Sequence, residues 1–445
     1  MNPRSVVCLL ALVSLIPVPA HAQFANPRRL AMGGVAIASG GPGSEGANVA
    51  YRAVPRAPAS YGGIGLPIGV VQLLSDLPEF DSDEPDFNAY ELANLLYNLP
   101  WNYQLGGTTA PSSDITITVA KDRLAVDLGE VGDVFPKEKS RVGAVMSQPL
   151  FTIGVKRAFV GIVPLVHYEN ELDLNDALRS ALRDGEDFRT GTQYSMTDAA
   201  TAQAAVGLAL GWAGPLAVVG DARTTGGHGL YVGARGKLLR GLAYGDADNL
   251  VSFTTSDTLF GSDPVDVRYH GLLRGAEAAD GGFGAGLDVG AVWVAGPLEL
   301  GLGVNDIGTR LHWKVQEELA ETDTVENDVV STTLRESADF TSEVPVTVTA
   351  NAALRLGTLL LAADVQRTPN ATLAHAGAEL WRGRWALRAG AMLDAYQDPQ
   401  VSGGVGVRLG RIGLDAAVAT HSRNVQRERT AELGLGLTFY PGGER

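Results

Sequence analysis

The sequence predicts an all-β fold: an antiparallel transmembrane β-barrel of about 14 strands (roughly 12–16), with an N-terminal plug and a few short helices in its loops. Three observations predict it. The chain opens with an export signal, its second half repeatedly alternates apolar with small or polar residues, and the connections between these segments alternate between short and long. Barrels of bacterial outer membranes combine these features.

The first 22 residues have the order of parts that is typical of a secretory signal peptide. Arg4 supplies a positive charge, an apolar stretch follows over residues 6–18, and Ala20-His21-Ala22 forms a small-residue cleavage site. We expect cleavage after Ala22. The only cysteine, Cys8, lies in this segment, so the mature chain has no disulfide.

Charge and composition narrow the class of protein further. The formal charge is -15, and removal of residues 1–22, which hold one Arg and no acid, takes it to -16. Phosphate binding needs clustered Lys and Arg, so this acidic chain is not expected to bind nucleic acid. The most apolar mature segment, 204–220, is interrupted by glycine and proline and has period two, which favours strands over a membrane helix.

Period-two alternation defines the strands. In segment 203–213 one face carries Val206, Leu208, Leu210 and Trp212, and the other carries small residues. Further alternating segments follow at 285–294, 298–305, 385–391, 405–409, 412–418 and 433–439. Such alternation predicts strands that are apolar on one face only.

Connection length separates a membrane barrel from a soluble β-sandwich. Short turns are expected at 214–215, 240, 296–297, 357, 382–384 and 410–411. Longer loops are expected at 222–228, 254–280, 307–343, 367–371, 394–400 and 421–430. Counting back to 158–168 gives about 14 strands. Strand-like pieces at 61–74, 114–128 and 142–155 raise the count to about 16 or form an inserted subdomain.

Aromatic residues cluster at the ends that carry the short turns. Membrane barrels place aromatic girdles at the lipid–water interface. The expected periplasmic girdle is Trp212, Trp293, Trp381, Trp385 and Tyr440, and Trp313 is expected to mark the opposite girdle.

The rest of the chain is expected to form a hatch inside the barrel and insertions between its strands. Residues 23–60, rich in Gly and Pro, are expected to form a hatch in the lumen, and residues 61–445 the barrel. Insertions are expected near 75–112, with a short helix at 89–97, and near 169–200, with a helix capped by Asn175 or Asp176. The acidic segment 316–343 is expected to be a mobile external loop.

The polar side chains on the expected lumen face are the candidate site. We favour an ion-pair network that fills the barrel over a polar path or ligand site, because lumen faces are ordinarily polar. In the hatch, glycines beside Met32 would let the backbone pass close to the wall, although an ordinary turn also explains them. The lumen candidates are Asp288, Glu299, Arg355, Asp364, Glu379, Arg388, Arg408 and Asp415, and the hatch candidates are Met32, Gly33 and Gly34.

Neither metal nor enzyme chemistry is indicated. Acidic residues over 76–86 lack the spacing and central glycine of a calcium-binding EF-hand, which favours a solvated loop. The six mature histidines are scattered, and H-E-x-x-H, G-x-S-x-G and Walker motifs do not occur. We therefore expect no enzyme activity, no metal and no cofactor.

Several motifs resemble those of FadL-like and PorV-like outer-membrane barrels. Residues 29–36 resemble the family's "ALGMGGA" opening, although Asn48-Val49-Ala50 departs from the usual Asn-Pro-Ala, and 233–241 is similar to its "G-R-x-K-x-L-x-G" strand. Segments 375–379 and 385–390 resemble its penultimate hairpins. The resemblance implies a location in the outer membrane of a Gram-negative cell, with membrane lipid as a partner. It also implies recognition by the barrel-assembly machinery through Glu432, Gly434, Leu437 and Phe439.

The family implies two alternative functions. FadL-like passage of hydrophobic or amphiphilic small molecules predicts an apolar pocket beside the hatch and an interruption in the wall. A PorV-like, non-transporting scaffold or secretion accessory predicts a lumen sealed by ion pairs. A third reading, a soluble periplasmic β protein, predicts a polar outer face.

Overall fold

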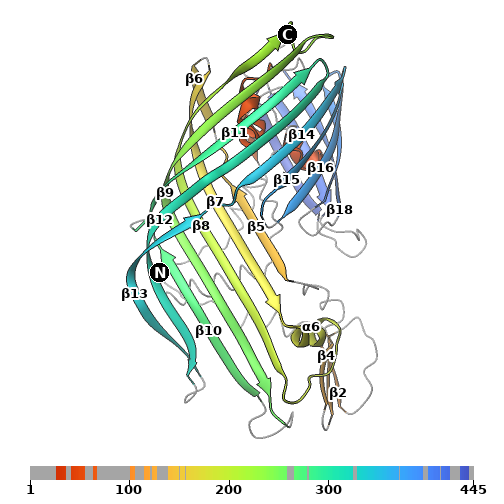
Figure 1. Cartoon of the computed structure of the whole chain (residues 1–445). Helices are drawn as coiled ribbons and strands as arrows, with labels where there is room; N and C mark the ends of the chain where they lie inside the picture. Colours follow the sequence, from red (N-terminus) through yellow and green to blue (C-terminus); the bar gives the residue numbers. More distant parts are fainter. Residues whose placement is uncertain are drawn as a thin grey trace.

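A computed structural model describes residues 27–36, 42–55, 64–67, 101–105, 115–120, 123–127, 139–149, 151–155, 157–257, 265–277, 280–323, 328–369, 371–393, 399–410, 412–420 and 431–439. Nearly all of these residues lie in strands of one large antiparallel sheet that curves into a barrel (Figure 1), which confirms the predicted fold class. Within the described ranges no helix is long and apolar enough to cross a membrane.

The strands follow the chain in order around the sheet. The first ones are β1 (Ile64–Pro67), β5 (Ser140–Met146), β6 (Phe151–Val155), β7 (Ala158–Leu174), β8 (Gln193–Val219), β9 (His228–Thr255), β10 (Val265–Ala276) and β11 (Phe283–Ala295). The later ones are β12 (Leu298–Asp323), β13 (Asp328–Glu343), β14 (Thr347–Leu356), β15 (Leu359–Arg367), β16 (Thr372–Arg382), β17 (Trp385–Leu393), β18 (Pro399–Leu409), β19 (Ile412–Thr420) and β20 (Ala431–Phe439).

Short helices and a small second sheet complete the fold. The helices are α2 (Pro27–Ala31), α3 (Pro42–Ala47), the 3-10 helix η2 (Val49–Arg52) and α6 (Asp176–Arg183). Strands β2 (Trp101–Leu105), β3 (Ile115–Ala120) and β4 (Arg123–Asp127) form the second sheet. The side chain of Asn175 caps α6 by accepting a hydrogen bond from the backbone N–H of Leu178.

One half of the molecule is a barrel of fourteen described strands. Their order is β6, β7, β8, β9, β11, β12, β14, β15, β16, β17, β18, β19, β20 and β1. We call this part the barrel half. The described registers run without a break from β6 to β1, and the junction between these two edge strands falls outside them.

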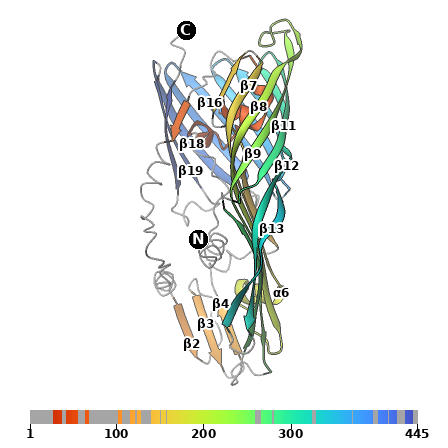
Figure 2. The ribbon, with the colours of Figure 1, turned by 90° about the vertical axis from the view of Figure 1, so that its left-hand side faces the viewer.

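The other half is a tall extension of one side of the barrel (Figure 2). Strands β8, β9 and β12 have 27, 28 and 26 residues, whereas β14 to β19 have between 9 and 11. The lower ends of β7, β8, β9 and β12, together with β5, β10 and β13, form this extension. At about 3.3 Å per residue, β9 is roughly 90 Å long, which is about three times the length of β14.

The extension changes the predicted connections. Gly214-Pro215 and Arg240 lie inside β8 and β9, so the turns predicted there are wrong. The chain reverses at that end of the barrel instead between β6 and β7 and at 220–227, where Gly220 has a positive φ. The predicted loops at 254–280 and 307–343 are largely strands, because β10 and β13 pair with β9 and β12. Segment 316–343 is therefore not an unstructured external loop.

The count of about 14 strands survives these errors because two of them compensate. The wrongly predicted turns divided β8 and β9 and so added two strands to the count. Strands β1 and β6, which come from the strand-like pieces at 61–74 and 142–155, take the place of these two. Of the expected insertion at 75–112, the structure describes only β2, and the signal peptide and the helix expected at 89–97 lie outside the described residues.

Candidate functional site

The outer face of the barrel half is a continuous apolar surface. Residues that alternate along each strand are exposed there, among them Leu208 at 52%, Leu302 at 51% and Leu387 at 55%. We call this surface the belt; further members are Val160, Ile162, Val206, Leu210, Leu238, Leu300, Leu361, Val405, Leu414 and Val418. A soluble protein rarely exposes so large an apolar area. The third reading, a soluble protein with a polar outer face, therefore does not fit.

Three tryptophans lie on the belt near the end that carries the short turns. Trp212, Trp293 and Trp385 are all partly exposed. Trp212 lies beside the beginning of β7, because the backbone N–H of the next residue, Ala213, donates to the carbonyl oxygen of Arg157.

Two tryptophans that were expected on the outer surface lie inside. Trp381 has the guanidinium of Arg388 6.0 Å from its ring centroid, so it faces the lumen. Trp313 is 2% exposed and packs against Tyr244, so it does not form the opposite girdle. Period two places Trp381 on the same face as Glu379, so its inward position followed from the sequence, whereas Trp313 lies in a segment that was expected to be a loop. Tyr440 lies outside the described residues.

The lumen of the barrel half is filled by the N-terminal segment. Helices α2, α3 and η2 lie inside the ring of strands (Figure 1). Met32 is fully buried against Val35, Ala353 and Leu360. We call the described residues 27–36 and 42–55 the hatch.

Gly33 lies where the hatch meets the wall. Its φ is +68°, and a Cβ added to it would be 2.5 Å from the carbonyl oxygen of Ala391. Gly377 and Gly390 of the wall make the matching approach to Met32 and Gly33. Gly34 also has a positive φ, and its carbonyl oxygen accepts a hydrogen bond from Arg29. The absence of Cβ atoms on both sides allows the two backbones to touch.

Buried ion pairs fix the first part of the hatch. Arg28 donates to both carboxylate oxygens of Glu379, at 2.7 and 2.6 Å. Glu379 also accepts from Arg388 at 2.8 Å, and Arg388 donates to Asp415 at 2.6 Å. A two-oxygen contact of this kind is among the strongest side-chain interactions. Arg28 of the hatch is thus the first of four side chains of alternating charge, and the other three lie on β16, β17 and β19.

A second contact holds the end of this segment. Asp364 accepts from the backbone N–H of Ala36 at 2.6 Å through one oxygen and lies 2.6 Å from Nδ1 of His375 through the other. Both side chains are buried.

The second part of the hatch is held by its own set of polar groups. Asn48 accepts from the N–H of Ala50 and donates to the carbonyl oxygen of Ala291. Asn351 donates to the hydroxyl of Tyr51. Arg52 pairs with Glu45 at 3.1 Å and lies over the ring of Phe159.

Two further predicted residues pair with each other across the wall. Glu299 accepts from Arg355 at 2.7 Å and from Arg223 at 2.6 Å. Arg223 also donates to the carbonyl oxygen of Pro55, which ties the end of the hatch to the turn at 220–227. Arg408 instead bonds the carbonyl oxygen of Gly410 at the end of its strand.

Asp288 belongs to the most deeply buried charge cluster. It pairs with Arg235 at 2.5 Å and with Lys237 at 2.8 Å, and Lys237 also reaches Asp306 at 2.7 Å. Ser147, between β5 and β6, donates to Asp306 at 2.5 Å. The sequence prediction had Asp288 but missed both cations. Arg235 and Lys237 alternate along β9 with Ala234, Gly236 and Leu238, and this pattern could have placed both cations on the lumen face.

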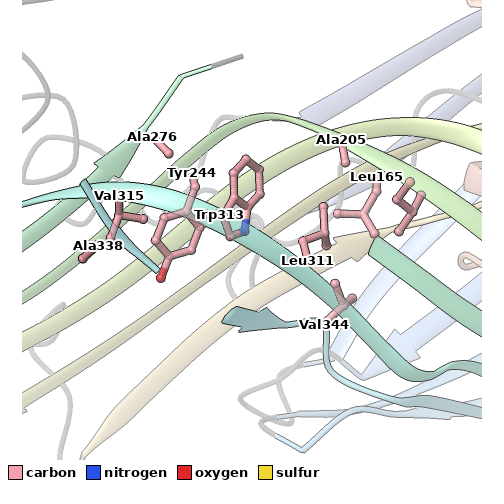
Figure 3. Close-up of a cluster of buried hydrophobic side chains, with 10 residues drawn as sticks. Leu165, Ala205, Tyr244, Ala276, Leu311, Trp313, Val315, Ala338 and Val344 are labelled. Carbon is pink, nitrogen blue, oxygen red and sulfur yellow. The ribbon is translucent and has the colours of Figure 1, made fainter. Parts of the chain in front are cut away.

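An apolar cluster lines the inner face of the wall beyond this charge cluster (Figure 3). Tyr244, Trp313 and Phe340 have ring centroids 5.2–5.5 Å apart in contacting pairs. We call this the inner cluster; its buried members are Leu165, Ala205, Leu239, Tyr244, Ala276, Leu311, Trp313, Val315, Ala338 and Val344, with Val145 and Phe340 beside them. It lies where β10 gives way to β11 and β13 to β14 as partners of β12.

Polar groups border the inner cluster. The indole of Trp313 donates to Ser342, Ser342 donates to Gln203, and Gln203 contacts His167 at 2.9 Å. Arg274 lies over Phe340 and pairs with Asp246 and Glu317. The inner cluster therefore has an apolar centre and a polar border. The described residues contain no group of His, Cys, Asp or Glu placed to hold a metal ion.

The comparisons with known proteins identify a family but no activity. Residues 150–443 match the model of the Family of unknown function (DUF5723). No curated protein matches the chain. Among solved structures, the toluene transporter TodX of Pseudomonas putida is similar with a TM-score of 0.26 and 13% identity, over 68% of this chain and 87% of that chain.

The ferric-catecholate import receptor Fiu of E. coli K12, in its open form, is similar with a TM-score of 0.20 and 11% identity. That match covers 70% of this chain and 62% of the receptor. At TM-scores this low neither likeness extends to the whole arrangement, so the function of this chain has to follow from its own residues.

Proposed function

We propose that this chain, which belongs to the Family of unknown function (DUF5723), is an outer-membrane β-barrel that passes hydrophobic or amphiphilic small molecules. The location is supported by the belt, whose exposed Leu and Val side chains lie on β14 to β19 and on the barrel parts of the longer strands. Strands β14 to β19, with 9 to 11 residues, have about the length that crosses a bilayer. The signal peptide expected at residues 1–22 supports export.

The observation that carries the passage is the inner cluster. A water-filled channel has a polar lining, yet here Tyr244, Trp313 and Leu311 share one inner surface. The hatch closes the axial route above it through buried ion pairs. A hydrophobic molecule would bind in place of the packing within the inner cluster, where the extension joins the barrel half, and would enter the barrel half from there.

A second function is favoured by the same ion pairs. A lumen sealed by the contacts of Arg28, Asp364 and Glu299 is what a non-transporting, PorV-like scaffold or secretion accessory predicts. In this alternative the hatch never opens, and the extension presents a surface to protein partners.

An uptake assay tests transport directly. The protein is reconstituted in liposomes and offered a panel of fatty acids and small hydrophobic dyes. Uptake above that of empty liposomes supports passage, and a further increase in Arg28→Ala, which removes one hatch ion pair, supports gating by the hatch. No uptake by either protein across the panel contradicts passage and leaves the scaffold function.

Photolabelling tests the binding surface without a variant. A fatty acid that carries a diazirine on its chain is irradiated with the reconstituted protein, and labelled peptides are identified by mass spectrometry. We expect label on peptides that contain Tyr244, Trp313 or Phe340, reduced by excess unlabelled fatty acid. Label confined to belt residues would show contact with bulk lipid alone and would contradict an internal site.

A further inference from the structure

On β11 the belt ends at the first residue of the strand. Phe283, at the beginning of β11, is 70% exposed on the outer face. Trp293 lies ten positions later on the same face of the same strand. At about 3.3 Å per residue and a strand tilt of about 40°, the two rings are separated by roughly 25 Å along the barrel axis, the height of the apolar band of outer-membrane barrels.

The outward residues between these two aromatics are apolar. They are Ala285, Leu287, Val289 and Ala291. Trp293 is thus the aromatic at the short-turn boundary of the belt, and Phe283 occupies the equivalent position at the other boundary.

The neighbouring strands change character at the level of Phe283. Arg240 of β9 lies directly opposite Phe283 in the register, and its guanidinium carbon is 4.6 Å from the ring centroid. On the other side, Arg310 of β12 lies opposite Ala285. Below this level β12 turns outward His312 and Lys314, and Lys314 pairs with Asp339. The two strands that flank β11 therefore each carry an arginine on the outer face close to the level of Phe283.

We propose that Phe283 and Arg240 form the second membrane boundary of this barrel, and that the Arg240 guanidinium binds the phosphate of a lipid headgroup there. The inference rests on the proposed membrane location. Aromatic rings favour the interface because one side meets hydrocarbon and the other meets water. A guanidinium matches the geometry of a phosphate, and its flat face stacks on an aromatic ring at the same time.

This boundary divides the molecule into two parts. The barrel half lies in the bilayer, and the extension stands in water on the side opposite the short turns. The acidic groups of the extension, among them Asp246 and Glu317, are then surrounded by protein and water and do not contact lipid. The aromatic residues that pack beside α6, among them Tyr194 and Phe253, also belong to the extension.

Spin-label depth measurements test the boundary. The only cysteine, Cys8, lies in the expected signal peptide, so single cysteines are placed in the mature chain at Leu287 in the belt, at Phe283 and at Val330 in the extension. We expect the Leu287→Cys label to be accessible to oxygen, the Val330→Cys label to a water-soluble nickel chelate, and the Phe283→Cys label to both equally. A Phe283→Cys label as deep as that of Leu287→Cys would overturn the boundary. A Leu287→Cys label that meets only water would instead overturn the membrane location.

A lipid comparison tests the phosphate contact. The protein is reconstituted in vesicles of phosphatidylglycerol or of a galactolipid that lacks phosphate, and the temperature that unfolds the barrel is read from heat-modified migration on gels. We expect a higher temperature in phosphatidylglycerol for the wild type and for Arg335→Gln, a control in the extension. The difference is expected to shrink by at least half in Arg240→Gln. An undiminished difference in Arg240→Gln would overturn the contact.

Discussion

Lys237 shows how a single residue stabilises the barrel half. Its ammonium group is fully buried between Asp288 and Asp306 and receives no screening from water. Buried pairs add little relative to an apolar substitute, but removal of one partner strands the other charges. Asp306 is the only non-glycine residue with a positive φ among the described residues, at 63°, and its backbone N–H donates to Asp288. The cluster therefore fixes backbone geometry as well as charge.

We predict that Lys237→Met destabilises the barrel by about 3–5 kcal/mol, because Asp288 and Asp306 lose their common cation. The control is Lys314→Met, whose exposed pair with Asp339 contributes at most about 1 kcal/mol. Urea unfolding of the two variants in detergent or lipid measures the difference. Equal losses for both variants would contradict a structural role for the buried cluster.

Gly33 allows a second test at the residue scale. An added Cβ would meet the backbone of Ala391, so we expect Gly33→Ala to displace the hatch at a cost on the order of 1–3 kcal/mol. The displacement would expose Arg28 and Arg29, and the rate of trypsin cleavage there measures it. Gly383→Ala is the matched control, since Gly383 also has a positive φ but nothing within 4 Å of an added Cβ. Cleavage at wild-type rate in Gly33→Ala would contradict close contact between hatch and wall.

Strands β8 and β9 show what an element adds. Along its barrel part each is apolar outside; the inner face of β9 carries Arg235 and Lys237, whereas that of β8 carries alanine and glycine. β-Bulges near 204–205 and 215–217 interrupt their register. A bulge lets a strand change its twist and the direction of its side chains. In the extension both faces meet other groups: Tyr244 lies toward the inner cluster, while Asp198 accepts a hydrogen bond from Asn170 on the opposite face.

The burial of Asp198 predicts how the extension responds to pH. Burial raises the pKa of Asp198 above its ordinary value of 3.8, so the folded state holds the proton more tightly than the unfolded state. The resulting stabilisation is complete below pH 3.8 and is lost as the pH rises through the raised pKa. We expect the protection of amide hydrogens from exchange in the extension to decrease as the pH rises from 3.8 through the raised pKa of Asp198.

Asp198→Asn provides the control for this prediction. An amide cannot ionise, so the variant is expected to keep its protection across the same pH window and to be at least as stable as wild type at neutral pH. Hydrogen exchange read by mass spectrometry over β8 and β9 makes the comparison. A wild-type pH profile in the variant would assign the titration to another group.

At the scale of the whole molecule, the belt is the feature that decides the environment. Leu302 in the belt and Leu334 in the extension have the same exposed fraction, 51%, so they differ in position alone. We predict that Leu302→Arg destabilises the membrane-inserted barrel by about 2–4 kcal/mol, whereas Leu334→Arg is nearly neutral. Folding into lipid vesicles measures both, and an equal effect of the two substitutions would contradict insertion of the belt.

The hatch and the wall also act together only at this scale. Arg28 and Glu379 are separated by 351 positions in the chain, yet their contact ends a network that reaches Asp415. The two proposed functions differ in whether this network opens. The uptake assay with Arg28→Ala therefore tests whether weakening this network at one residue changes passage through the whole barrel.

The sequence by itself determined the all-β class, the alternation of faces and the identity of Glu379, Arg388, Asp288 and Asp364 as inward polar residues. These follow from period two, which is a local property of the chain. Only the tertiary structure decided that β8 and β9 run on past Gly214 and Arg240, that Trp313 faces inward, and that Arg28 and Lys237 join the buried charges. The reason is physical: pairing with a neighbouring strand overrides the turn tendency of a glycine, and closure of the sheet fixes which face becomes the lumen.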